Sequence, residues 1–275
     1  MKKILLSLLI ASALLNANAQ IKTPAPSPTQ TIKQDFGISS IELIYSRPGI
    51  KGRKIFGDLV PWNKVWRTGA NSATRIKFND DVTFGGQALK AGEYAIYTVP
   101  GESEWEIIIN KGSANWGTDY KKEDDIFRIK VKPIKLDQPV ETFTMQFANV
   151  KPTSADLRIA WDKTAVAVPI TTDIDKKVMA QINSVMTKDN RPYFQAAMYY
   201  LETGKDLNQA LTWFDKGIEQ NPDAFYMYYQ KANTLVKLGR KNEAKIISQK
   251  SMALAREQKN DDYVLLNEKL LADLK

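Results

Sequence analysis

The segment Glu93–Ile109, EYAIYTVPGESEWEIII, decides the fold class of this chain. Glu93 to Val99 is rich in β-branched and aromatic residues, and it ends at the turn signal Pro100-Gly101. Trp105 to Ile109 then resumes the same pattern. Two such runs separated by a short polar loop predict a β-hairpin.

Strand patterns continue on both sides of this hairpin. Val82 to Leu89 predicts another hairpin, because Gly85-Gly86 suits the positive φ angles of a tight turn. The other predicted strands are Ile38–Tyr45, Arg75–Phe78, Ile126–Ile134, Glu141–Val150, Ala155–Trp161 and Thr164–Ile170, with turns at Lys151-Pro152 and Asp162-Lys163. About nine short strands without a helix between them indicate an antiparallel β-sandwich or barrel over residues 32–170. We expect Trp105, Phe143, Phe147 and Trp161 in its core.

From Thr171 to the end the pattern is helical, so the fold class is α+β in two parts. Thr171-Thr172-Asp173 can cap a helix that runs to about Thr187, with Ile174, Val178, Ile182 and Val185 on one face. Ala210 and Ala244 then lie 34 positions apart, which is the tetratricopeptide spacing. We expect two repeat units over about 191–259 and a capping helix at Asp261–Leu274. The second unit is degenerate, because Ser248 and Ser251 replace an aromatic residue and an alanine.

The amino terminus is typical of a secretory signal. Lys2 and Lys3 precede an apolar run, Ile4 to Leu15, that is too short to span a bilayer, and Ala17-Asn18-Ala19 is a small-x-small cleavage site. We therefore expect a signal peptide at 1–19, a Pro-rich linker at 20–31 and an exported, periplasmic or secreted product. No other apolar run reaches membrane-spanning length, so no transmembrane segment is expected after cleavage.

The composition excludes several classes of enzyme. The chain has no histidine and no cysteine, which removes histidine-based triads, Cys-His dyads and the common zinc sites. It also lacks G-x-S-x-G, S-x-x-K, G-x-G-x-x-G and P-loop motifs. No metal, cofactor or catalytic residue is therefore assigned. The net charge of +8 is modest, and for an exported protein it favours an anionic glycan, lipid headgroup or acidic protein over nucleic acid.

The charge is concentrated in one irregular segment, Tyr45–Ser72, YSRPGIKGRKIFGDLVPWNKVWRTGANS. From Arg47 to Lys77 there are eight basic residues and one acid, Asp58. Guanidinium groups that converge here would bind a carboxylate, sulfate or phosphate. The candidate ligand-binding residues are Arg47, Arg53, Lys54, Trp62, Trp66, Arg67 and Asn71. The alternative, which we favour slightly, is that these arginines bind backbone carbonyls and pin the loop.

The tryptophans also allow two interpretations. Pro61 can begin a short helical turn that places Trp62 and Trp66 on one face. Together with Trp116 in a second irregular segment they would form a platform for stacking a sugar. Packing into the core beneath the loops is the interpretation we favour, since aromatic rings supply most buried area.

Paired carboxylates are the remaining route to acid–base catalysis. The pairs are Glu104 with Glu106, Asp80 with Asp81, and Asp124 with Asp125. A glycosidase needs two carboxyl groups that converge across a cleft from separate elements. Each of these pairs is local in sequence and is typical of solvated turns or strand edges.

Several blocks of the β region resemble one family. They are Tyr45-Ser46-Arg47-Pro48, Lys51–Gly57, Val65–Asn71 and Ala91-Gly92-Glu93-Tyr94, and together they resemble the family catalogued as domain of unknown function 2911 over about Ile32 to Ile170. The resemblance implies an exported bacterial protein, often followed by helical repeats, and it supplies no catalytic residues. The repeat resemblance over about Arg191 to Lys259 implies helix hairpins of the kind that bind peptides.

The sequence therefore predicts a non-catalytic binding or assembly protein of the bacterial envelope. Its Arg/Trp loop would meet an anionic or carbohydrate ligand, and its helical repeats a protein partner. Two alternatives stay open: a carboxylate-dependent hydrolase acting on envelope glycan, and a structural spacer without a ligand.

Overall fold

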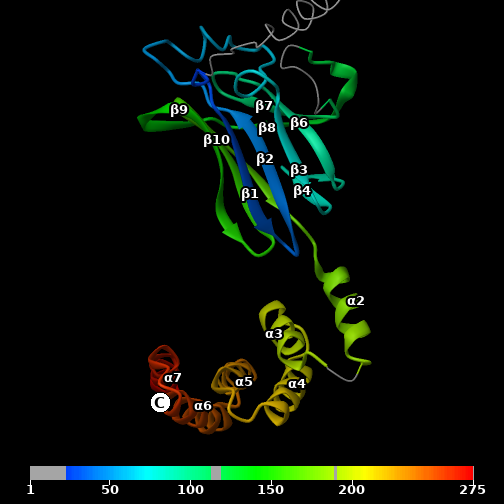
Figure 1. The fold of residues 1–275 in the computed structure, drawn as a ribbon, viewed down its shortest axis with the longest axis vertical. Helices are drawn as coiled ribbons and strands as arrows, with labels where there is room; N and C mark the ends of the chain where they lie inside the picture. Colours follow the sequence, from blue (N-terminus) through cyan, green and yellow to red (C-terminus); the bar gives the residue numbers. More distant parts are fainter. Residues whose placement is uncertain (1–22, 113–118, 189–190, 275) are drawn as a thin grey trace, which may run out of the picture. The chain divides into compact units, whose positions relative to one another are not determined.

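The computed structural model describes residues 23–112, 119–188 and 191–274. The expected signal peptide and Trp116 lie outside these residues. The chain divides into a β unit that ends at Ile174 and a helical unit that begins at Asp175. Strands build the first unit and helices the second (Figure 1), which confirms the two-part fold class.

In the described residues, the larger sheet of the β unit has six antiparallel strands in the order β1-β2-β3-β6-β7-β8. Their bounds are Thr29–Phe36 (β1), Ser39–Ser46 (β2), Thr74–Phe78 (β3), Gly92–Val99 (β6), Trp105–Asn110 (β7) and Asp125–Val131 (β8), and a 3-10 turn, η1, covers Lys122–Asp124. The hairpin predicted from Glu93–Ile109 is the pair β6 and β7, with Val99 opposite Glu106. The β-branched and aromatic residues on either side of the Pro100-Gly101 turn signal were sufficient to predict both strands.

The smaller sheet has the order β5-β4-β10-β9. Its strands are Val82–Phe84 (β4), Gln87–Leu89 (β5), Ile134–Lys151 (β9) and Ser154–Thr171 (β10). At the turn between β4 and β5, Gly85 and Gly86 have φ of 56° and 86°, as the hairpin prediction required. A Cβ atom on Gly85 would also clash with Ile129 of the other sheet, so a glycine is needed here for packing as well as for conformation.

Three strand predictions were wrong. The predicted strand Ile126–Ile134 ends at Val131, and Ile134 instead begins β9, which starts well before the predicted Glu141. The segments Ala155–Trp161 and Thr164–Ile170 form one continuous strand, β10, and the predicted turn at Asp162 is only an irregularity in its pairing with β9. Asp162 has a φ of 50°, which lets the strand bulge and continue. Another error is β1, which was not predicted as a strand and whose first three residues fall in the predicted linker. Its polar sequence TQTIKQDF fits an edge strand that pairs only with β2.

The main apolar core of the β unit lies between the two sheets, and a smaller cluster gathers around Tyr97 and Ile108. Trp105, Phe143 and Trp161 are buried in the main core, as predicted, and Phe147 is half-buried at its margin. The Tyr45 hydroxyl joins the sheets, because it accepts a hydrogen bond from Met145 N at 3.0 Å and lies 2.9 Å from Met145 O. β2 and β9 are thus held together by a polar bond as well as by apolar contact. The two sheets and their shared core make the unit a β-sandwich.

The helical unit is built from helix hairpins. Its described helices are Asp175–Val185 (α2), Tyr193–Thr203 (α3), Leu207–Gln220 (α4), Phe225–Lys237 (α5), Lys241–Glu257 (α6) and Asp261–Asp273 (α7). Ala210 in α4 and Ala244 in α6 are fully buried where the hairpins pack, as the repeat spacing predicts. The first helix begins later than expected, because β10 continues to Thr171, and of its predicted apolar face only Ile182 is buried.

The two serines that make the second repeat degenerate have a partner in α7. Ser248 Oγ lies 2.8 Å from Asn267 Oδ1, and Asn267 Nδ2 donates to Ser251 Oγ at 3.0 Å. Asn267 Nδ2 also donates to the carbonyl of Tyr263, and Ser251 Oγ to that of Phe225. Because all three side chains are fully buried, these bonds fix α7 against α6 in place of the usual apolar contact.

Candidate anion-binding pocket in the Arg/Trp loop

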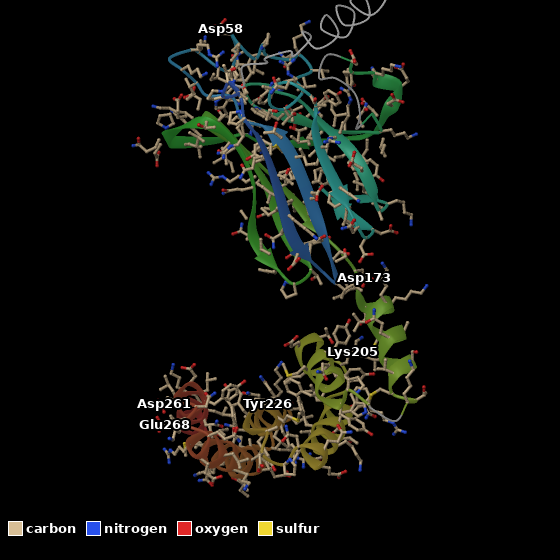
Figure 2. All side chains as sticks on the ribbon, viewed as in Figure 1. Asp58, Asp173, Lys205, Tyr226, Asp261 and Glu268 are labelled. Carbon is tan, nitrogen blue, oxygen red and sulfur yellow. The ribbon has the colours of Figure 1, made fainter. Side chains whose placement is uncertain are left out.

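The segment between β2 and β3 is attached along the free edge of β9. Gly49 forms a bridge with Thr142, Phe143 N donates to Pro48 O, and Ile50 N donates to Glu141 O. Figure 2 places Asp58, the acid of this segment, among the loops at one end of the sandwich, and Asp173 at the other end. The segment is therefore an ordered cap on one end of the β unit, which we call the Arg/Trp loop (residues 47–72).

Two of the candidate arginines bond to the protein itself. Arg47 donates from Nε to the carbonyl of Phe143 at 3.2 Å and from Nη2 to Thr144 Oγ1 at 2.9 Å. Arg53 donates from Nε to Ile50 O at 3.0 Å and from Nη2 to Gly49 O at 2.6 Å. Arg47 is thereby a structural link between the loop and β9. Arg53 closes its own turn, yet its side chain remains exposed.

Asn71 has a structural position as well. Its Nδ2 donates to Ser27 O and to Ser46 Oγ, both at 3.2 Å, and so holds the chain before β1 against the Arg/Trp loop. Lys54 is exposed and makes no hydrogen bond or ion pair through its side chain within the described residues. Neither residue lines the pocket described below.

The two loop tryptophans do not share one helical turn, as the sequence had suggested. No helix forms at Pro61–Trp66. Trp62 stacks on Phe56 with centroids 5.8 Å apart, whereas Trp66 stacks on Trp161 at 5.8 Å and bonds through Nε1 to Gly69 O. Both rings are half-buried against the core, and they line different hollows of the surface.

The chain after Trp66 is held in an unusual conformation. Thr68 has a φ of 56°, which is costly for a β-branched residue, and its side chain is fully buried. Its Oγ1 lies 3.2 Å from Thr98 Oγ1, and its carbonyl accepts from Thr74 Oγ1 at 2.6 Å. These bonds fix the backbone directly beside Arg67, and so they fix the direction in which Arg67 leaves the loop.

A hollow of about 400 Å³ opens beside this turn. Its cations are Lys51, Arg53, Lys64 and Arg67, and none of the described residues that line it is an acid. Trp66 and Trp161 form part of its wall, together with apolar loop residues and the chain at Pro26-Ser27. We call this hollow the loop pocket. The nearest carboxylate that the structure records, Glu141, lies behind the lining, where its Oε1 accepts from Lys51 N at 3.0 Å. Four cations against one such acid in a half-enclosed space favour an anion.

Arg67 is the residue whose hydrogen bonds are least satisfied. Its Nε is buried and has no partner among the described residues, and its side chain forms no ion pair there. The terminal nitrogens of Arg67 are not buried and also have no hydrogen bond within the described residues, so they are the donors that an anion in the pocket can reach. Of the seven candidate residues, the structure brings Arg53, Trp66 and Arg67 together in the loop pocket.

Sequence reasoning missed the pocket's other members. Lys51 and Lys64 were counted in the basic run but not selected, although both line the pocket. Trp161 was assigned to the core alone, and Pro26-Ser27 to a linker. Their roles depend on contacts between residues far apart in the chain, such as that of Lys51 Nζ with Pro26 O at 3.5 Å.

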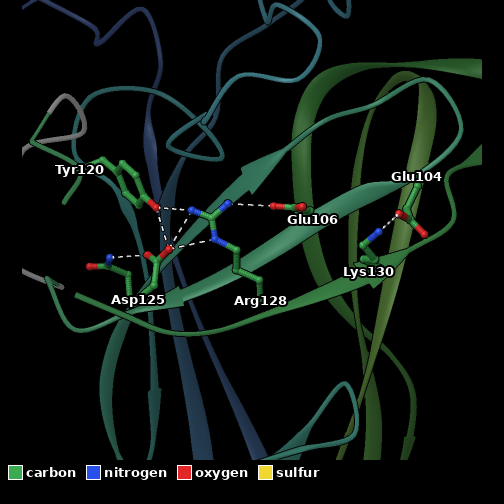
Figure 3. A network of polar contacts seen from close by, with 7 residues as sticks. Glu104, Glu106, Tyr120, Asp125, Arg128 and Lys130 are labelled. Atoms are coloured by element: carbon green, nitrogen blue, oxygen red, sulfur yellow. Dashed lines mark hydrogen bonds and ion pairs between the residues drawn. The ribbon is translucent and has the colours of Figure 1, made fainter. Parts of the chain in front are cut away.

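At least one carboxylate of each of the three pairs is engaged in an ion pair. Figure 3 shows Arg128 between Glu106 and Asp125, at 2.9 Å from each. Glu104 pairs with Lys130 at 2.7 Å, and Asp81 with Lys90 at 2.8 Å. Carboxylates whose charge is already matched by a cation are poorly suited to converge on a substrate.

The same network changes the acidity of a tyrosine. Tyr120 donates to Asp125 Oδ2 at 2.7 Å, and Arg128 Nη2 donates to the Tyr120 hydroxyl at 2.6 Å. Burial raises the pKa of Tyr120, the bond to Asp125 raises it further, and Arg128 lowers it, with a result of about 12. Asn110 is fully buried beneath this network and donates to Asp125 Oδ1 and to Lys121 O. These contacts fasten the chain before β8 to β7.

None of the helices in the described residues combines the length and apolar character needed to cross a bilayer. Nor do those residues contain a group of three or more acids placed to hold a metal ion.

Comparison with known families follows the division of the chain. Residues 225–258, which are α5 and α6, match the Tetratricopeptide repeat, so the unit that carries Ser248 and Ser251 is the one matched. No curated protein matches the sequence significantly. Residues 27–170 match the family described as Protein of unknown function (DUF2911), and this match includes β1, the Arg/Trp loop and both sheets. Because it spans more than half of the chain, the protein belongs to the DUF2911 family.

Proposed function

We propose that this protein is an exported, non-catalytic binding protein of the bacterial envelope. Its loop pocket binds an anionic group, and its helical repeats bind a protein partner. The observation that carries the first part is Arg67, whose guanidinium has no partner among the described residues and which lines a pocket with four cations and no acid in its described lining.

The helical part of the proposal is supported by the repeat at residues 225–258, a kind of unit that commonly serves protein binding. In the same hairpins, Tyr226 and Tyr229 of α5 and Tyr263 of α7 are half-buried aromatic side chains in edge contact with their neighbours. Half-buried tyrosines are well suited to interfaces, because each has an apolar ring and a polar hydroxyl.

Export is supported by the pattern of Met1–Ala19. Mass spectrometry of the protein recovered from fractionated cells would test it, with Gln20 expected as the first residue and the periplasm or medium as the compartment. A full-length chain in the cytoplasm would contradict this part of the proposal.

Calorimetric titration of the purified protein with anionic envelope fragments, namely acidic oligosaccharides and peptidoglycan stem peptides, tests the pocket. Arg67→Gln removes the guanidinium that has no internal partner, and we expect it to weaken binding at least tenfold, since a charge-assisted hydrogen bond is lost. Arg158→Gln is the matched control, because Arg158 is half-buried on β10 and does not line the pocket. Binding that is equal in both variants would place the ligand elsewhere, and no binding at all would favour a structural spacer.

A further inference from the structure

The loop pocket offers hydrogen-bond donors but very few acceptors. Its polar side chains are those of Lys51, Arg53, Lys64 and Arg67, which can only donate. Among the described lining residues there is no aspartate, glutamate, asparagine or glutamine, and the hydroxyl of Ser27 is the exception that can accept.

Several backbone acceptors around the pocket are already occupied. The carbonyls of Gly49 and Gly69 accept from Arg53 and Trp66, respectively. The Pro26 carbonyl accepts from Lys51 Nζ, and that of Ser27 from Asn71 Nδ2. The Pro48 carbonyl accepts from Phe143 N, and that of Val60 from Gly57 N. A ligand rich in hydroxyl or amine groups would find few side-chain acceptors for its donors, and unpaired donors are costly in a half-enclosed site.

The rest of the wall is apolar. Trp66 lies against Trp161 with the two rings 16° from parallel, and its N–H is already bonded to Gly69 O, so the indole can offer only its carbon surface. Leu59, Val60 and Val65 line the pocket as well. A volume of about 400 Å³ lies at the lower end of the range of small-molecule sites, so the pocket suits a small ligand.

We propose that the loop pocket binds a carboxylate joined to an apolar body, that is, a small aryl or acyl acid without hydroxyl groups. This inference rests on the proposed anion-binding function and narrows it. The carboxylate lies against Arg67 and the neighbouring cations, which supply bidentate donors. The apolar body lies against Trp66, where it displaces water from carbon surface. The same chemistry argues against the carbohydrate ligand that the sequence had suggested, because sugar hydroxyls need acceptors.

Calorimetric titration with a graded set of small probes tests this choice. The lead probe is 3-phenylpropionate, and octanoate is the acyl counterpart. Three further compounds each remove one feature: 3-phenylpropionamide lacks the charge, acetate lacks the apolar body, and glucuronate replaces that body with hydroxyl groups. Inorganic phosphate measures the response to a bare anion. We expect the lead probe to bind at least tenfold more tightly than each of the four comparison compounds.

The variants are Arg67→Gln and Lys64→Gln, with Arg158→Gln as control. We expect each pocket variant to weaken 3-phenylpropionate, Arg67→Gln by at least tenfold, and the control to leave it unchanged. Lys64 is exposed and its side chain is unbonded within the described residues, so its variant should fold even if Arg67→Gln does not.

The outcomes separate the two proposals. If glucuronate or phosphate binds as tightly as 3-phenylpropionate and still depends on Arg67, the pocket is an anion site but the apolar-acid inference is wrong. If the amide binds as well as the acid, the charge has no role, and both proposals fail. If no compound in the set binds, the apolar-acid inference fails, and the anion-binding proposal fails with it only if the anionic envelope fragments do not bind either.

Discussion

Replacement of Asn267 by alanine should loosen the last helix of the repeat unit. The change removes three buried hydrogen bonds, to Ser248, Ser251 and the carbonyl of Tyr263. Each contributes about 0.5–1.5 kcal/mol net, and a buried hydroxyl left without a partner costs about 1–3 kcal/mol. Ser251 keeps its bond to Phe225 O, but Ser248 has no alternative partner in the described residues. We therefore expect a loss of about 2–4 kcal/mol.

Hydrogen exchange followed by mass spectrometry is the appropriate assay, because α7 can open without global unfolding. A loss of about 2–4 kcal/mol corresponds to exchange in Asp261–Asp273 that is roughly 30- to 700-fold faster. Asn242→Ala is the matched control, since Asn242 is exposed on α6, and it should change exchange by less than threefold. A double-mutant cycle with Ser248→Ala should give a coupling of about 0.5–3 kcal/mol. If α7 exchanges at the same rate in Asn267→Ala as in Asn242→Ala, the buried hydrogen bonds of Asn267 do not hold α7 in place, and the reasoning is refuted.

Three further predictions concern the β unit. Arg47→Met keeps the length of the side chain but removes two hydrogen bonds to β9. The free energy of unfolding in urea should therefore fall by about 2–3 kcal/mol. An unchanged unfolding midpoint would mean that water replaces these two bonds at no cost. Tyr45→Phe deprives Met145 N of its buried acceptor and should cost about 1–3 kcal/mol in the same assay, and a cost below about 0.5 kcal/mol would contradict the inter-sheet role. Tyr120 should lose its proton near pH 12. The ultraviolet spectrum of the native protein minus that of Tyr120→Phe, recorded against pH, isolates this titration. Asp125→Asn should lower the pKa of Tyr120 toward the ordinary value of about 10. Because the folded pKa of Tyr120 is raised, its contribution to stability is complete below about pH 10 and is lost as the pH rises toward 12.

The strands and repeats were predictable where local pattern and packing agree. The hairpins at Val82–Leu89 and Glu93–Ile109 could be predicted because the β-rich runs and the turn glycines lie within a few residues of each other. The tetratricopeptide repeat could be predicted for a similar reason, since the alanine at each helix crossing recurs at a fixed interval. In contrast, β1 was missed, because a polar edge strand has no apolar alternation and is defined only by its bonds to β2.

The candidate site was predictable in composition but not in geometry. The sequence indicated that arginines and tryptophans of residues 47–72 either bind a ligand or pin the loop. The structure divides the two roles among them: Arg47 bonds to a carbonyl on β9, whereas Arg67 lines a pocket with an unpaired Nε. Nothing local distinguishes these two arginines. Their directions follow from contacts with residues distant in sequence, such as Phe143 for Arg47 and Thr98, which bonds to Thr68 beside Arg67.

By itself, the order of amino acids determined the two-part architecture, the position of the basic loop and the absence of imidazole and thiol chemistry, because these depend on periodicity and composition. The tertiary structure alone decided which cations are used to hold the loop and which remain for a ligand. It also paired the two unexpected serines with an asparagine in the next helix. The physical reason is the same in each case: a side chain's free donors are known only after its distant neighbours have taken theirs.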